Sequence, residues 1–201
     1  MSFLYGIFGK ILNMFYGMTG SFGLSIIILT VLIKIILLPV TLKQDKSMKE
    51  MKKLQPKIDE LKSKYKGDPQ LLNQKTMELY KEHKVNPAGG CLPMLVQLPI
   101  LWALFGVLRK EGVVPDETFL WFSLITPDPF FILPILNGAI SFVQQKIMGT
   151  ANNPQMKKMM YMFPLMMVFI SYKMPGGLQL YWLISSLSGV AQQYFVMNRG
   201  E

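Results

Sequence analysis

Cysteine and histidine are almost absent from the 201 residues, which hold only Cys91 and His83. One cysteine cannot form an intrachain disulfide, and one cysteine with one histidine cannot supply the ligands of an ordinary zinc site. The chain also has no glycine-rich phosphate loop and no nucleophile beside a base. We therefore predict no metal, no cofactor and no enzymatic activity. We interpret Gly89, Gly90 and Cys91 as a backbone bend and His83 as a solvated residue.

Acidic residues are scarce, because 12 Asp and Glu stand against 21 Lys and Arg. A basic patch on a globular domain would suggest nucleic acid. Here, however, twelve of the basic residues lie between Lys43 and Lys84, with apolar blocks on both sides. That distribution is typical of a cytoplasmic loop in a membrane protein. We expect no direct sequence-specific contact with nucleic acid and a modest attraction to anionic lipid headgroups.

Half of the composition (51%) is hydrophobic, and it is gathered in blocks that approach the ~20 residues needed to cross a bilayer. We predict an all-α integral membrane fold with five transmembrane helices, at residues 20–42, 87–109, 129–148, 159–173 and 177–196. Pro39 should bend or stop the first of them. The connections are an external segment, 110–128, with Trp121 and Phe122 suited to the interface, a cytoplasmic loop, 149–158, and a short cytoplasmic tail, 197–201.

Residues 1–19 carry apolar side chains at helical spacing and have no basic region of the kind that opens a secretory signal. We predict an external amphipathic helix lying in the membrane interface. The alternative is that this helix extends the first span, but Gly17, Gly20 and Gly23 interrupt the pattern.

Residues 43–86 form a polar segment in which Met48, Met51, Leu54, Ile58 and Leu61 step by three or four. This spacing gives one apolar face of a helix. Gly67, Asp68 and Pro69 then indicate a sharp turn before a second helix at about 70–84. The sequence predicts an antiparallel helical hairpin in the cytoplasm. The positive-inside rule then places the C-terminus in the cytoplasm and the N-terminus outside, a parity that five crossings satisfy.

Lys34 lies within the first apolar block, about eight residues from its cytoplasmic end and hence ~12 Å deep. A lysine near the centre of a membrane costs ~3 kcal/mol, which favours a position facing a protein interior or a hydrated cavity. Snorkelling to the interface is the alternative, although the side chain spans only part of that depth. The five predicted spans contain no acidic partner for Lys34, so we expect its charge to be available to a carboxylate from another molecule.

Neutral polar residues recur in the other spans, and together they could line a hydrated groove. Taken singly, each is explained by hydrogen bonds between helices. They are Gln97, Asn137, Gln144, Gln145, Gln179, Ser185, Ser186, Ser188, Gln192 and Gln193. The fourth block is rich in methionine, which suits a surface that accepts varied apolar partners, although lipid-facing packing is the more common explanation.

Five stretches strongly resemble the YidC/Oxa1/Alb3 family of membrane protein insertases, in the right order and over nearly the whole chain. NPAGGCLPMLVQLP is the most specific part of the resemblance. The stretches are TVLIKIILLP (30–39), LQPKI (54–58), LYKEHKVNPAGGCLPMLVQLP (79–99), DPFFILPIL (128–136) and PGGLQLYW (175–182).

The resemblance implies five spans, an external interfacial helix and a cytoplasmic hairpin. It also implies a hydrophilic groove whose basic residue, usually arginine, is Lys34 here. Lysine keeps the charge but lacks the bidentate fork of arginine. By the same matching, Thr30, Gln144, Tyr181 and Trp182 line or border the groove, to which we add Gln97. The second and fourth spans would carry a client helix. We expect neither a large external domain ahead of the first span nor the long basic tail of some members.

We therefore predict an ATP-independent, multi-pass insertase and chaperone of the bacterial plasma (inner) membrane. It would receive the hydrophilic segment of a client protein and release the apolar helix of that client into lipid, with or without the Sec translocon. The cytoplasmic hairpin could contact ribosomes or targeting factors. A small-solute transporter is an alternative, but the spans show no inverted repeat. A membrane enzyme is weaker, because no catalytic pair is visible near Lys34 or Cys91.

Overall fold

Helices make up most of the chain, and the computed structural model describes residues 2–85, 92–110, 114–147 and 154–198. A single two-stranded antiparallel sheet interrupts the helices in this part of the chain. In chain order the elements are α1 (Ser2–Thr19), α2 (Phe22–Lys53), α3 (Gln55–Lys64), α4 (Pro69–Glu82), α5 (Leu92–Arg109), β1 (Thr118–Phe119), β2 (Phe122–Ser123), α6 (Ile132–Ile147), α7 (Pro154–Ser171) and α8 (Gly176–Asn198). The predicted bend at Gly89 to Cys91 lies outside the described residues.

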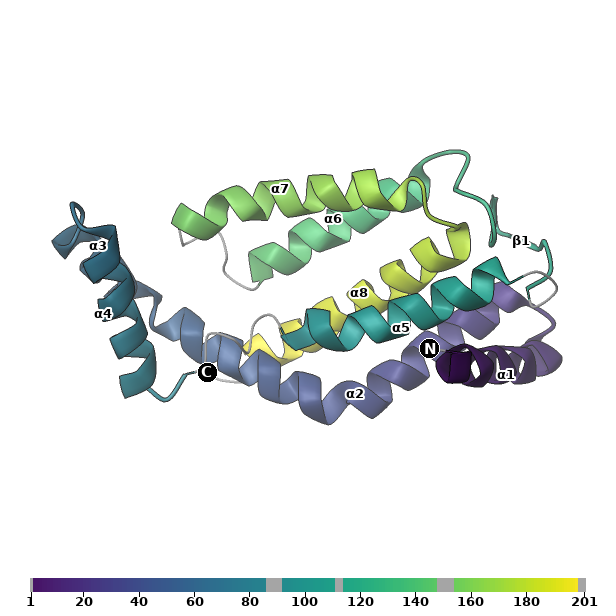
Figure 1. Cartoon of the computed structure of the whole chain (residues 1–201), viewed down its shortest axis with the longest axis horizontal. Helices are drawn as coiled ribbons and strands as arrows, with labels where there is room; N and C mark the ends of the chain where they lie inside the picture. Colours follow the sequence, from purple (N-terminus) through teal and green to yellow (C-terminus); the bar gives the residue numbers. More distant parts are fainter. Residues whose placement is uncertain (1, 86–91, 111–113, 148–153, 199–201) are drawn as a thin grey trace.

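The molecule is elongated, with α2, α5 and α8 running along its length (Figure 1). Helix α8 packs against both α2 and α6, and α7 packs along α6. Helix α1 lies against α2 and α5. Helices α3 and α4 lie at one end of the molecule, and the β1–β2 turn lies at the other (Figure 1).

One helix of the described residues, α2, is long and apolar enough to cross a membrane. Two further apolar helical stretches, Val96–Arg109 and Met160–Ser171, are shorter. Their lengths fall below the ~17–25 residues that a straight crossing of the hydrocarbon layer needs. Length and composition therefore identify α2 as a membrane-crossing candidate.

Helix α2 does not end near Leu42, as we predicted, but continues through Pro39 to Lys53. Proline removes one backbone hydrogen bond and crowds the preceding turn, yet Pro39 is exposed, so neighbouring helices do not confine its ring. Residues 43–53, which we assigned to the hairpin, thus continue the helix of the first span, and α3 begins at Gln55. Likewise α7 begins at Pro154, inside the predicted loop 149–158, since proline is well tolerated in the first turn of a helix.

Two carboxylates from the connection between α5 and α6 bind helix N-termini. Glu117 accepts hydrogen bonds from the Ser21 hydroxyl (2.6 Å) and the Phe22 backbone N–H (2.9 Å) at the start of α2. Asp128 accepts from the backbone N–H groups of Phe130 (3.1 Å) and Leu133 (2.7 Å) at the start of α6. An acidic group at a helix N-terminus satisfies free N–H donors and opposes the positive end of the helix dipole.

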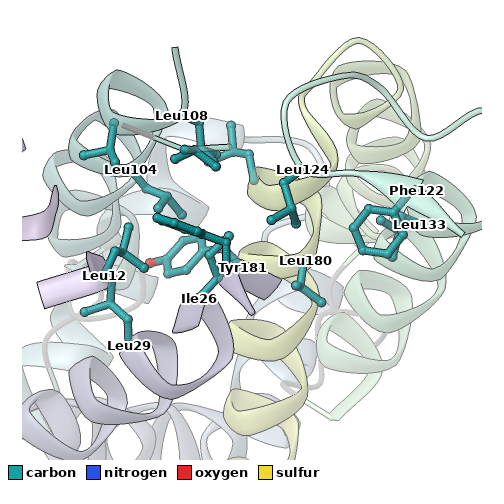
Figure 2. Packing of buried hydrophobic residues seen from close by; sticks show 14 residues of the cluster. Leu12, Ile26, Leu29, Leu104, Leu108, Phe122, Leu124, Leu133, Leu180 and Tyr181 are labelled. Atoms are coloured by element: carbon teal, nitrogen blue, oxygen red, sulfur yellow. The ribbon is translucent and has the colours of Figure 1, made fainter. Parts of the chain in front are cut away.

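The apolar core lies where α1, α2, α5 and α8 meet the connection that carries the sheet. Figure 2 shows Tyr181 of α8 pointing among leucine and isoleucine side chains from three other helices. Phe122 belongs to this core and is 1% exposed. The Phe122 ring is buried against Gly176 at the start of α8, so it packs within the protein, whereas the sequence suggested a ring suited to the interface. Trp121 is half-buried and donates to Asp128 (3.2 Å).

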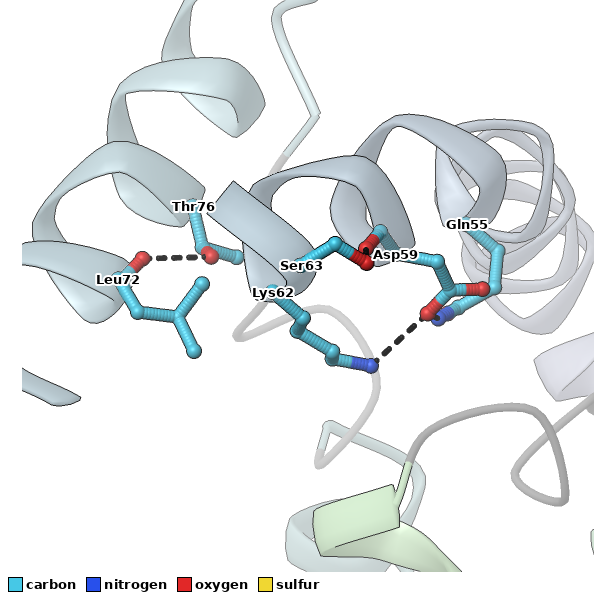
Figure 3. A network of polar contacts seen from close by, with 6 residues as sticks. All are labelled: Gln55, Asp59, Lys62, Ser63, Leu72 and Thr76. Carbon is cyan, nitrogen blue, oxygen red and sulfur yellow. Dashed lines mark hydrogen bonds and ion pairs between the residues drawn. The ribbon is translucent and has the colours of Figure 1, made fainter. Parts of the chain in front are cut away.

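Helices α3 and α4 contact each other. Asp68 caps α4 by accepting from the backbone N–H groups of Gln70 and Leu71, and Pro69 occupies the first helical position. On α3, Asp59 accepts hydrogen bonds from Lys62 and Gln55, each at 3.0 Å (Figure 3). The hydrogen bond and positive charge of Lys62 hold the pKa of Asp59 below its usual value. The three ion pairs found among the described residues all lie between Glu50 and Glu78.

Candidate functional site

Thr30 and Lys34 lie one turn apart on the same face of α2. Thr30 is buried and its hydroxyl donates to the Ile26 carbonyl (2.6 Å), so this hydroxyl is satisfied within its own helix. Lys34 is half-buried, whereas Ile35 and Ile36 on the neighbouring faces are exposed. The lysine is thus directed away from the apolar outer surface of α2.

Gln97 and Tyr181 are brought into direct contact from α5 and α8. The Gln97 amide donates to the Tyr181 hydroxyl at 2.7 Å. Tyr181 is only 2% exposed, and its ring packs in the apolar core (Figure 2). A buried phenol needs a hydrogen-bond partner, and Gln97 supplies it. This contact joins the two helices at the edge of the core.

Gln144 and Trp182 lie elsewhere on the α6–α8 side of the molecule. The Gln144 amide nitrogen lies over Gly189 of α8, 3.2 Å from the position a Cβ would take there. Trp182 follows Tyr181 in α8 and is half-buried. Among the described residues, no hydrogen bond joins Lys34 to Gln97, Gln144, Tyr181 or Trp182. Of the six predicted site residues, Gln97 and Tyr181 are thus the pair that the structure joins by a hydrogen bond.

A second polar cluster joins α2 to α8, and its acidic member was not predicted. Asp45 is 7% exposed and accepts a hydrogen bond from the Gln192 amide at 2.6 Å. The Gln192 carbonyl oxygen in turn accepts from the Thr41 hydroxyl at 3.1 Å. Gln44 beside them is 6% exposed, and neither polar atom of its side chain has a partner among the described residues. A buried carboxylate thus lies on the helix that carries Lys34.

Asp45 was not predicted as a site residue because it lies beyond the predicted end of the first span. Helical spacing could have found it, since Lys34 and Asp45 are eleven residues apart, about three turns. Residues at that spacing share a face, and Thr41 lies on the same face between them. The predicted spans contain no acidic residue, but α2 continues beyond the first of them and carries Asp45 roughly 16 Å further along the helix axis than Lys34.

Large apolar side chains cover the outer surface of α7 and part of α5. On α7 these residues are Tyr161, Met162, Leu165, Met166, Phe169 and Ile170. On α5, Trp102 is 51% exposed. Contiguous exposed apolar surface of this kind is unusual in a soluble monomer and typical of contact with lipid or apolar partners.

The fold and these residues define a class: a mostly helical membrane protein whose long apolar helix carries a lysine directed inward. The family described as 60Kd inner membrane protein matches residues 14–201. The chain is 65% identical over 205 residues to the "Membrane protein insertase YidC" of Fusobacterium nucleatum, covering 100% of both chains. It is 44% identical to the protein of the same name from Geobacter sp. strain M21, covering 96% of this chain and 38% of that protein.

A solved structure described as an active YidC insertase with its first transmembrane domain resolved matches 96% of this chain and 46% of that one. The TM-score is 0.78 and the sequence identity is 28%. The chain therefore belongs to the YidC family, as the resemblance predicted.

Proposed function

We propose that this protein is a membrane protein insertase that acts without ATP and makes or breaks no covalent bond. Support comes from the full-length match to a relative that is named an insertase. The single observation that carries the mechanism is Lys34, a half-buried cation on the long apolar helix. Burying a charge inside a membrane is costly, so a lysine at this position indicates a functional role and not a contribution to stability.

The proposed topology has five crossings, by α2, α5, α6, α7 and α8, in the bacterial inner membrane. Helix α1 would lie in the external interface, and α3 and α4 would stand in the cytoplasm. The lysines between Lys43 and Lys84 support this orientation through the positive-inside rule. The shorter apolar helices are compatible with crossing where helices pack together and the bilayer thins locally.

In the proposed mechanism, the hydrophilic segment of a client enters a hydrated groove bordered by Thr30, Lys34, Gln97, Tyr181 and the α6–α8 residues Gln144 and Trp182. Lys34 attracts acidic residues of that segment. At an effective dielectric near 20, a charge pair at 4 Å gains about 4 kcal/mol before desolvation. Asp45 reduces the positive field along the same face, so Lys34 alone would hold an acidic segment only transiently.

The apolar helix of the client would move along α5 and α7 into lipid. The exposed apolar side chains of α7 and Trp102 of α5 support this path. Apolar burial supplies the driving force at ~25 cal/mol per Å². Client membrane proteins and the bilayer are the partners that this mechanism requires. The Sec translocon, ribosomes and targeting factors are further candidates, which would bind through α3 and α4.

The test uses a single-span client with an acidic external tail. It compares how well four proteins insert this client: wild type, Lys34→Ala, Lys34→Arg and Lys43→Ala. Lys43 is the matched control, because nine residues of helix place it on the opposite face of α2, where it is exposed. Lys34→Ala should insert this client on the order of tenfold less well, a loss of ~1.4 kcal/mol. Lys34→Arg and Lys43→Ala should stay near wild type.

A second client with a neutral tail separates attraction of charge from damage to the fold. Its insertion should fall much less in Lys34→Ala than insertion of the acidic client. Undiminished insertion of the acidic client by Lys34→Ala would refute the role proposed for this lysine.

A further inference from the structure

A cavity of about 410 Å³ lies in the seam between α2 and α8. It begins at Leu38, one helical turn beyond Lys34 on the same face of α2, and none of its lining residues belongs to the six site residues named above. Four of its five lining residues are apolar: Leu38, Leu42, Phe195 and Val196. Its volume is within the ~300–1,000 Å³ of typical small-molecule sites. Leu38 is 40% exposed and Phe195 is 63% exposed, so the cavity lies at the outer surface of the helices.

The polar lining residue, Gln192, is already satisfied inside the protein. Its amide donates to Asp45 at 2.6 Å, and its carbonyl oxygen accepts from Thr41 at 3.1 Å. Because these bonds hold both polar atoms of its side chain, the cavity offers an occupant mainly apolar contact. The occupant of the cavity itself should therefore be a hydrocarbon group.

Lysines follow the cavity along the same face of α2. Leu38, Leu42, Lys46 and Lys49 are spaced by four, four and three residues, which places them in one row. Lys46 is exposed. Lys49 donates to the backbone carbonyl of Val196 at 3.3 Å, which fixes its ammonium group beside a residue that lines the cavity. Two positive charges thus lie one to two turns beyond the apolar part of the row.

We infer that the α2–α8 cavity binds one acyl chain of an anionic phospholipid, whose phosphate contacts Lys46 and Lys49. The apolar part of α2 lies in the hydrocarbon layer, and the lysine end lies at the headgroups. A lipid combines these two chemistries in the order the row presents them. Two lysines near the surface predict a preference for anionic over zwitterionic lipid on the order of tenfold. The inference requires that α2 crosses the membrane but does not depend on the insertase mechanism.

The test measures lipid bound to the purified full chain by native mass spectrometry, during titration with phosphatidylglycerol or phosphatidylcholine of identical acyl chains. The double variant Lys46→Gln/Lys49→Gln should lose the preference for phosphatidylglycerol and bind both lipids alike. The matched control, Lys43→Gln/Lys66→Gln, removes the same charge from exposed positions outside this row, one on a different face of α2 and one beyond α3, and should keep the preference. Leu42→Trp fills the cavity and should reduce binding of both lipids severalfold.

Inorganic phosphate in large excess distinguishes a lipid site from a simple phosphate site. Phosphate should leave bound phosphatidylglycerol in place if the acyl chain is held in the cavity, whereas displacement would refute the lipid assignment. Wild-type lipid binding by both Lys46→Gln/Lys49→Gln and Leu42→Trp would also overturn it. That result would place the bound lipid elsewhere on the protein. Thermal unfolding of each variant checks that loss of binding is not loss of fold.

Discussion

Single neutral side chains join helices that are otherwise held together by apolar packing. Gln97 and Tyr181 connect α5 to α8. The Asn137 side-chain amide of α6 donates to the backbone carbonyl of Gln179 in α8 at 3.2 Å. Hydrogen bonds between membrane helices contribute modestly, about 0.6 kcal/mol on average. Removing one partner of a buried pair costs more, because the other partner is left unsatisfied.

Tyr181→Phe should lower the free energy of unfolding in detergent by about 1 kcal/mol, because the half-buried Gln97 amide loses its acceptor. Tyr194→Phe is the matched control, because this substitution removes the same hydroxyl group from a side chain that is 57% exposed. Tyr194→Phe should have little effect. The pair is isolated by a double-mutant cycle with Gln97→Leu, measured by denaturant unfolding. Additive effects of the two changes would contradict the coupling.

The identity of the polar residues was predictable from the sequence, but their pairing was not. Gln97 and Tyr181 both stand out among apolar neighbours, yet they are 84 residues apart and come from helices whose rotation only packing decides. Asp45 was missed for a different reason. Hydropathy marks where apolar residues stop, and α2 continues as a helix beyond that point.

At the scale of helices, glycine sets how closely α6 and α7 approach. A Cβ added to Gly138 would overlap the Val168 side chain and lie 3.3 Å from the Pro164 carbonyl oxygen. Gly138→Ala should therefore destabilise the protein by about 1–3 kcal/mol, since the β-branched Val168 side chain is stiff and cannot easily move aside. Gly17→Ala is the control, because nothing lies within 4 Å of its Cβ position.

Both glycine variants are compared by thermal unfolding in the same detergent. Gly17→Ala should be neutral or should stabilise α1 by up to ~1 kcal/mol through helix propensity. Equal stability of Gly138→Ala and wild type would show that α6 and α7 separate without cost.

Helix α3 should be sensitive to acid through Asp59. The pKa of Asp59 is held below its ordinary value of 3.8, mainly by the hydrogen bond from Lys62. A lowered pKa in the folded state stabilises α3 above pH 3.8, and this contribution disappears as the pH falls through the folded value. Because the pair is exposed, the effect should be a few tenths of a kcal/mol.

Amide hydrogen exchange in α3 measures this contribution, with Asp59→Asn compared with wild type at each pH. Near pH 6 the variant should exchange slightly faster. Below the folded pKa the two proteins should exchange at the same rate. A difference that persists in acid would assign the effect to packing instead of charge.

The elements themselves differ in how far sequence predicts them. The long apolar runs predict helices reliably, because many residues in each run contribute to the same periodic signal. Two-residue strands such as β1 and β2 carry no alternation that a pattern could reveal. The start of α7 at Pro154 had a signal, proline in the first turn, which its polar neighbours obscured.

Across the whole molecule, the distribution of positive charge predicts which end faces the cytoplasm. Gly67, between α3 and α4, and Thr126, after β2, are both exposed. The α3–α4 pair and the strand β1 lie at opposite ends of the structure (Figure 1). In a Cys91→Ser background, Thr126→Cys should react with a membrane-impermeant maleimide in intact cells. Gly67→Cys should react only after the membrane is made permeable. Labelling of Gly67→Cys in intact cells would reverse the proposed orientation.

The unbroken course of α2 gives the molecule a mechanical property. At 1.5 Å per residue this helix is about 48 Å long, and its last turns join α3 directly at Leu54. Lys34 divides this helix into a shorter and a longer arm, and Pro39 lies in the longer one. By that geometry, a tilt of about 10° about Lys34 would displace Lys53 by roughly 5 Å. A rigid tilt of this kind would couple movement of α3 and α4 to the depth of Lys34, and the coupling would be weakest at Pro39, which lies between the two.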